Sequence, residues 1–93
     1  MASGRIQKIP SFTATEAVTA NTSLNTLTTP GVYRIWGTYQ DAPLTSGLYG
    51  FMLVLGDGST RQVQVLFAAT SAYVYYRGYS NDQWNPWRTL FVT

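Results

Sequence analysis

From Gly31 onward, the sequence alternates short runs of β-branched and aromatic residues with Gly, Pro, Asn and Asp. The runs favour extended strands, and the residues between them favour turns. The pattern therefore predicts an all-β fold, a small antiparallel meander or sandwich of about five strands with an extended N-terminal arm. Repeats of roughly 20 to 50 residues are not visible, which argues against solenoids and propellers.

Turn signals divide this part of the chain into its expected strands. Gly56-Asp57-Gly58-Ser59 is the clearest hairpin signal, because such loops supply the positive φ that tight hairpins require. Ser80-Asn81-Asp82 indicates a second turn, and Pro86 interrupts pairing, so the last strand should start near Trp87. The expected strands cover residues 31–39, 48–55, 61–68, 72–79 and the segment from 87 onward.

The apolar alternation predicts which side of each strand is buried. In residues 61–68, Val63, Val65 and Phe67 form an apolar face, opposite a face that carries Gln62 and Gln64. The polar face should meet solvent or a partner. The strand at 48–55 is mostly apolar, so both of its faces are expected to be covered.

Residues 1–23 differ from the rest and are expected to be an arm that docks or links, followed by a knob-like β domain over 24–93. Ile6, Ile9 and Phe12 are apolar at a spacing of three, which suits packing on a neighbouring subunit or on the domain itself. The stretch from Thr15 to Val18 should be extended rather than helical, because Thr-rich surroundings are poor helix formers. Ser23 is a candidate cap for a helical turn that ends at Leu27.

Composition excludes much known chemistry. The chain has no Cys and no His, so thiolate or imidazole metal sites, Cys nucleophiles and His bases are absent, and no metal or cofactor is expected. The acids Glu16, Asp41, Asp57 and Asp82 are scattered, and the last two stand in turn contexts, so a carboxylate pair for glycoside hydrolysis is unpromising. We therefore expect no enzyme and hold a polysaccharide depolymerase as a minor alternative.

Charge and hydropathy limit the partners. The net charge of +2 comes from few charged residues, 11% of the chain, so neither a nucleic-acid surface nor strong counterion release is indicated. The longest apolar stretch, residues 48–55, is far shorter than the roughly 20 residues of a membrane-spanning helix, so no membrane insertion is expected.

Aromatic side chains are abundant, at 15% of the residues. Trp and Tyr rings stack on the apolar faces of sugars, while Asn, Gln, Asp and Arg bind the hydroxyls. Trp36 and Trp87 lie in apolar strand patterns and are expected in the core, whereas Trp84 and Tyr79 flank a turn and suit either exposure or core. The candidate glycan-binding residues are Trp84, Tyr79, Tyr75, Arg77, Tyr73 and Asn81.

Several of these motifs occur in a familiar order. The segment from Leu24 to Tyr33 reads Leu-Asn-Thr-Leu-Thr-Thr-Pro-Gly-Val-Tyr, and a loop with Pro43 follows the next strand. Further on come the strand at residues 63–67, then Tyr75-Tyr76-Arg77, then Trp84-Asn85-Pro86-Trp87-Arg88. This series, over about residues 24 to 92, resembles the knob domain of phage tail fibres and R-type pyocin fibres.

The resemblance implies a small β-rich knob on a trimeric virion fibre, at or near its tip, that contacts a host surface, often a polysaccharide. It implies no catalysis. The leading hypothesis is a non-enzymatic bacteriophage virion component, assembled in the host cytoplasm, that binds a host-surface glycan as a homotrimer and contacts other virion proteins. The alternative is a structural capsid or tail decoration, or an adaptor, without receptor contact.

Overall fold

The computed structural model describes residues 13–14, 16–57, 60–69 and 73–90, and the candidate arm residues Ile6, Ile9 and Phe12 lie outside these ranges. The elements in chain order are β1 (Glu16–Val18), the 3-10 turn η1 (Leu24–Thr26), β2 (Gly31–Gly37), β3 (Leu48–Gly56), β4 (Gln62–Ala68), β5 (Val74–Ser80), β6 (Gln83–Trp84) and β7 (Arg88–Thr89). The all-β prediction is confirmed. No helix within the described ranges is long and apolar enough to cross a membrane.

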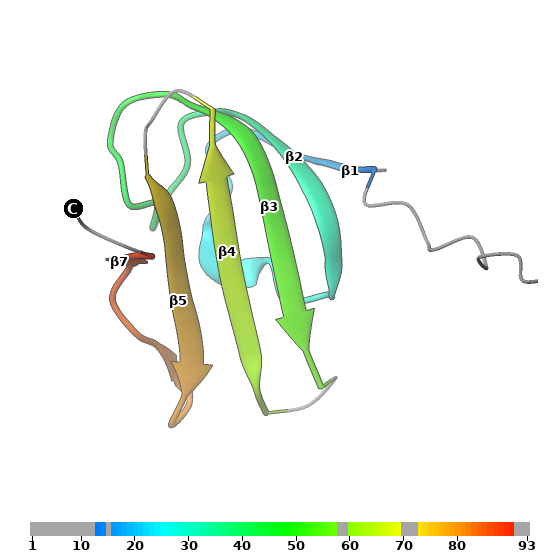
Figure 1. Ribbon diagram of the computed structural model, residues 1–93, viewed down its shortest axis with the longest axis vertical. Coiled ribbons are helices and arrows are strands. Elements are labelled where there is room, and N and C mark those ends of the chain that lie inside the picture. Colours follow the sequence, from blue (N-terminus) through cyan, green and yellow to red (C-terminus); the bar gives the residue numbers. More distant parts are fainter. Residues whose placement is uncertain (1–12, 15, 58–59, 70–72, 91–93) are drawn as a thin grey trace, which may run out of the picture.

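The four long strands form an antiparallel meander, as expected, and the short strands extend its two edges (Figure 1). Neighbours in the chain pair in the order β2, β3, β4, β5. β1 adds to the free edge of β2 in parallel, with Ala17 opposite Arg34. At the other edge β5 pairs with both β6 and β7, which flank Pro86.

Short polar residues shape the turns as their chemistry predicts. Asn81 and Asp82 both have positive φ, 52° and 64°, and join Ser80 to Gln83 as a two-residue hairpin. In the β3–β4 hairpin, whose residues 58–59 are not described, the Asp57 carboxylate accepts hydrogen bonds from the backbone N–H groups of Thr60 (3.0 Å) and Arg61 (3.1 Å). Ser23 caps η1, because its hydroxyl accepts from the backbone N–H of Asn25 at 3.2 Å. The segment between the expected strands at residues 61–68 and 72–79 is a turn at Ala69, and residues 70–72 are not described.

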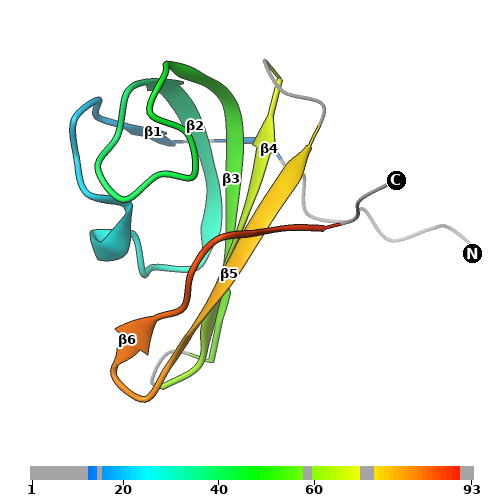
Figure 2. The same cartoon turned by 90° about the vertical axis from the view of Figure 1, so that its left-hand side faces the viewer.

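One side of the sheet carries the core. Figure 2 shows β1, η1 and the loop between β2 and β3 gathered on the same side of the long strands. Leu24 of η1 and Tyr39 of that loop are buried against this side, and the Tyr39 hydroxyl donates to the carbonyl of Val18 at 2.7 Å. The buried apolar residues are Leu24, Tyr33, Ile35, Tyr39, Leu48, Met52, Val54, Leu66, Ala68 and Tyr75.

The predicted facing of β4 was wrong. Gln64 and Leu66 point into the core, and Val63 and Phe67 stand on the other side, where Phe67 is 45% exposed. Gln64 is fully buried because its polar atoms are satisfied there. Its amide nitrogen donates to the carbonyls of Leu24 (2.7 Å) and Leu27 (2.9 Å), and its amide oxygen accepts from Arg77 Nε at 2.9 Å.

Two further expectations about burial, for β3 and for Trp36, were wrong because only one face of the sheet is covered. No described residue covers the second face of β3. Tyr49 and Phe51 on that face are exposed, whereas Met52, which points to the other face, is buried. Trp36, expected in the core, is 73% exposed on β2 and meets Tyr49 edge to face at 5.1 Å. The covering segments all lie on one side, so the strands have only one buried face.

Candidate ligand site

Arg77 on β5 lies between two tryptophan rings. Its guanidinium carbon is 4.5 Å from the ring centre of Trp84 and 4.4 Å from that of Trp87, which are distances of favourable cation–π contact. The Asn81-Asp82 hairpin places Trp84 opposite Tyr79, and Trp87 directly precedes β7, so both rings return to β5. Arg77 is only 5% exposed.

The rings of Trp84 and Trp87 also hydrogen-bond to two other segments, η1 and the loop between β2 and β3. The indole N–H of Trp84 donates to the carbonyl of Asn25 in η1 at 3.1 Å. The indole N–H of Trp87 donates to the carbonyl of Asp41, in the loop between β2 and β3, at 2.7 Å. Three stretches that are distant in sequence therefore meet at Arg77.

Burial is the main influence on the pKa of the Arg77 guanidinium. Loss of solvent lowers the pKa of Arg77 to about 10, while the negative charge of Asp41 acts in the opposite direction. The guanidinium therefore stays charged at neutral pH. Its Nη2 atom is buried and has no hydrogen-bond partner within the described residues. Those residues also include no group of three acidic side chains that could hold a metal ion.

A cleft of about 660 Å³ opens beside this stack, and we call it the tryptophan–arginine cleft. Its lining consists of Asn25, Asp41, Ala42, Arg77, Tyr79, Asp82, Gln83, Trp84, Asn85, Pro86 and Trp87. Amides, which donate and accept hydrogen bonds, and carboxylates, which accept them, thus lie around large aromatic rings, and Tyr79 and Trp84 are in edge contact at 5.2 Å. This combination suits a small polar ligand with apolar ring faces.

The structure brings some of the expected glycan-binding residues together and separates others. Arg77, Tyr79 and Trp84 line the cleft. Asn81 is exposed in the adjoining turn but is not part of the lining. Tyr75 is buried in the core, and Tyr73 is exposed at the start of β5, with its ring 6.3 Å from that of Tyr75.

Other lining residues were not among the expected set. Asn25 and Asp41 come from segments that precede the long strands β3 to β5, so no local pattern connects them with Trp84. Trp87 was expected in the core, and it is half-buried with one ring face on Arg77. The spacing of two tryptophans after Tyr75-Tyr76-Arg77 was the available signal for this contact.

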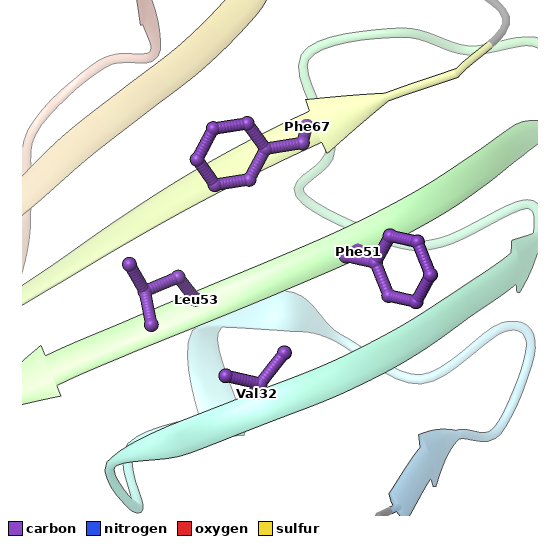
Figure 3. Close-up of a pocket in the computed structure, with 4 residues that line it drawn as sticks. All are labelled: Val32, Phe51, Leu53 and Phe67. Carbon is purple, nitrogen blue, oxygen red and sulfur yellow. The ribbon is translucent and has the colours of Figure 1, made fainter. Parts of the chain in front are cut away.

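The opposite side of the sheet presents a second surface of a different kind. We call it the open face: exposed apolar side chains of β2, β3 and β4, namely Trp36, Tyr49, Phe51, Leu55, Val63 and Phe67. A hollow of about 360 Å³ lies in it. Figure 3 shows the four residues that line this hollow, Val32, Phe51, Leu53 and Phe67. Single monomers rarely expose apolar patches of more than a few hundred square ångströms, so this surface suits a protein contact.

Comparison with known proteins identifies the fold. No family profile and no curated protein sequence matches the chain. The structure of the P. aeruginosa R1 pyocin fibre (C-terminal residues 323–701) matches with a TM-score of 0.74 and 16% identity, over 88% of this chain and 22% of that one. The corresponding R2 pyocin fibre structure (residues 323–691) matches with a TM-score of 0.73 and 20% identity, over 97% of this chain and 24% of that one.

An N-truncated R2-type pyocin tail fibre matches with a TM-score of 0.74 and 20% identity, over 88% of this chain and 34% of that one. This chain therefore spans at most about a third of the fibre fragments it matches. The resemblance seen in the sequence is confirmed at the level of the fold: the chain folds like part of the C-terminal region of pyocin tail fibres.

Proposed function

We propose that this chain is the knob of a phage or pyocin-type tail fibre, a non-enzymatic virion component that binds a host-surface glycan. The observation that carries the proposal is the shared fold, which extends over 88% to 97% of the chain. In this proposal the protein is part of the virion and acts at the surface of the host cell. The match identifies an architecture, and the two surfaces described above supply the chemistry.

The tryptophan–arginine cleft supports the glycan part of the proposal. Exposed amides of Asn25, Gln83 and Asn85 offer both donors and acceptors to hydroxyl groups. The rings of Trp84 and Tyr79 stand beside them. Sugars present the same combination of hydroxyl edges and apolar ring faces.

The open face supports assembly as a homotrimer. Its aromatic residues each offer roughly 150 to 250 Å² when fully covered. About half of that area is exposed at Tyr49, Phe51 and Phe67. Together with Trp36, Leu55 and Val63, the face approaches the roughly 800 Å² per partner of a stable interface. The cleft lies on the covered side, so assembly through the open face would leave each cleft accessible.

The glycan proposal is tested by binding of the purified protein to lipopolysaccharides and capsular polysaccharides from a bacterial strain panel. We expect Asn25→Ala, Gln83→Ala and Asn85→Ala to weaken binding at least about fivefold each, the factor for one lost hydrogen bond of about 1 kcal/mol. Thr45→Ala, exposed and outside the lining, is the matched control. Circular dichroism should show unchanged folding. Equal binding by all variants, or no binding by the wild type, contradicts the proposal.

The trimer is tested by native mass spectrometry at low and high concentration. Phe67→Glu places a charge in the open face and should convert trimers to monomers, whereas Thr45→Glu should leave the mass unchanged. A wild-type protein that is monomeric at every concentration would count against the trimer.

The adaptor without receptor contact remains the alternative, and the open face also favours it, because an apolar sheet face can dock on a different virion protein. The two functions separate when residues 1–12 are deleted, a cut that spares β1. Failure of particle incorporation with no glycan binding by the intact protein would favour the adaptor. Glycan binding that survives the deletion would favour the knob.

A further inference from the structure

The charges that a ligand would meet in the tryptophan–arginine cleft are mainly negative. Asp41 and Asp82 line the cleft and are both exposed. Among the described residues that line the cleft, Arg77 is the sole cation, and it is 5% exposed. A ligand entering from solvent therefore approaches two carboxylates before it approaches any positive charge.

Burial of Arg77 decides whether this cation can recognise an anion. Both neighbouring rings lie on the guanidinium, and its Nε atom is used by Gln64. The Nη2 atom, which has no partner among the described residues, is buried, so a carboxylate or phosphate on a ligand could not contact it without opening the stack. Arg77 therefore holds the two tryptophans in place and, at 5% exposure, offers little surface to an anionic ligand.

The remaining polar groups match uncharged hydroxyls. The amides of Gln83 and Asn85 both donate and accept, and the Asp82 carboxylate accepts from hydroxyl donors. An anionic sugar would place its charge near Asp41 or Asp82, where the described lining residues offer no accessible cation to compensate it, and exposed like charges repel.

We therefore propose that the tryptophan–arginine cleft takes a neutral, hydroxyl-bearing sugar unit and discriminates against uronic, sialic and phosphorylated sugars. This selectivity rests on the proposed glycan-binding function and gives the chemical class of its ligand. It also explains why Asp41 and Asp82 are compatible with a binding site in a chain whose net charge is +2.

The test uses the intact protein on an array of oligosaccharide pairs that differ only in a hydroxymethyl group or a carboxylate at C6. Suitable pairs are glucose with glucuronic acid, galactose with galacturonic acid and mannose with mannuronic acid. We expect the neutral member of any bound pair to bind more tightly, by a factor of up to about five, which is the effect of one exposed like-charge contact. Binding of the neutral member should change little between low and high salt.

Two variants sharpen the result. Asp82→Asn keeps a residue that tolerates the left-handed turn and removes one charge, and Gln83→Lys adds an accessible cation. Both should raise the affinity for the acidic member relative to the neutral one. Thr45→Lys adds the same charge as Gln83→Lys, but outside the lining. It should change the ratio of the acidic to the neutral affinity by no more than about twofold.

The outcomes separate the two proposals. A wild type that prefers the acidic member, or a preference that both cleft variants leave unchanged, overturns the neutral-sugar inference while glycan binding stands. Absence of binding to every glycan on the array overturns the proposed function, and the selectivity with it.

Discussion

The two faces of the central sheet differ in an unusual way. On the covered face, a glutamine and an arginine, Gln64 and Arg77, are buried among apolar residues. On the open face, Phe51, Phe67 and Trp36 are exposed although they are larger and more apolar. Burial in this domain is therefore set by which side the loops and η1 cover, and the polar residues beneath them are tolerated because their hydrogen bonds are made.

A satisfied polar network and an apolar surface respond differently to change. The network holds η1, the loop after β2 and the segment after β5 together through hydrogen bonds that side chains donate to backbone carbonyls. Removing one member leaves buried polar groups without partners, so the cost is large. A half-exposed apolar side chain has little native contact to lose within one chain.

The largest effect on stability is expected from Arg77→Ala. The change leaves the amide oxygen of Gln64 unpaired and opens a gap between Trp84 and Trp87. We expect the free energy of unfolding to fall by about 3–5 kcal/mol, measured by urea denaturation. Arg88→Ala removes an exposed arginine and should cost less than about 0.5 kcal/mol. Similar losses for the two variants would show that the network does not stabilise the covered face.

Gly50→Ala should have the next largest effect. Gly50 is buried on β3, and a Cβ there would lie 2.0 Å from the backbone carbonyl oxygen of Phe67, which can move only if the two strands separate. We expect a loss of about 2–3 kcal/mol by the same denaturation measurement. At Gly47 nothing lies within 4 Å of the added carbon, so Gly47→Ala should be close to neutral. A stable Gly50→Ala protein would mean that β3 and β4 are not packed this closely.

Tyr33→Phe tests a single hydrogen bond at the edge of the core. The Tyr33 hydroxyl donates to the carbonyl of Thr29 at 2.5 Å, so its loss should cost about 1 kcal/mol at pH 7. Burial, and to a smaller extent the charge of Glu16, raises the pKa of Tyr33 above its ordinary value of about 10.

Because the pKa of Tyr33 is raised, the difference in the free energy of unfolding between wild type and Tyr33→Phe depends on pH. The folded protein holds the phenolic proton more tightly than the unfolded chain, so the contribution is complete below about pH 10 and is lost as the pH rises further. The stability gap between wild type and Tyr33→Phe should therefore narrow above pH 10, as measured by denaturation at several pH values. Tyr49→Phe, on the open face, serves as the control, and a gap independent of pH would contradict the burial of Tyr33.

The smallest effect is expected from a substitution on the open face. Leu55 is 52% exposed, whereas its neighbour Val54 is 1% exposed on the covered side. Leu55→Thr should change the free energy of unfolding by no more than about 0.5 kcal/mol, at a concentration where the native mass is that of one chain. Val54→Thr buries a hydroxyl and should cost about 1–3 kcal/mol. Equal costs would mean that the single chain buries both faces.

Local chemistry made much of the fold predictable. The strand and turn boundaries follow from Gly, Asn, Asp and Pro at positions where the backbone must turn, as at Asn81 and Asp82. The cap at Ser23 and the extended stretch at residues 16–18 were likewise predicted from local chemistry and are confirmed.

Local chemistry did not predict which face of each strand is buried. Alternation in β4 separates Val63, Val65 and Phe67 from Gln64, and hydropathy alone places the apolar set inside. The structure reverses this because Gln64 has three hydrogen-bond partners, in η1, at its C-cap and in β5, which lie 13 to 40 positions away in the sequence. A similar reason applies to the cleft lining: the candidate residues Trp84, Tyr79 and Arg77 are near one another in sequence, while Asn25 and Asp41 arrive through tertiary contacts.

The tryptophan–arginine cleft is held in shape by hydrogen bonds to backbone carbonyls, and these bonds do not depend on which side chain the accepting residue carries. Asn25 and Asp41 accept the indole N–H groups of Trp84 and Trp87 with main-chain oxygens, which every amino acid possesses. The side chains of Asn25, Gln83 and Asn85 can therefore be exchanged while the indoles and Arg77 keep their positions. Asp41 is more constrained, because its φ is 62° and its carboxylate accepts a hydrogen bond from the Ser23 hydroxyl. Ligand preference can then diverge rapidly between related proteins over an unchanged framework, much as loops vary on a constant scaffold.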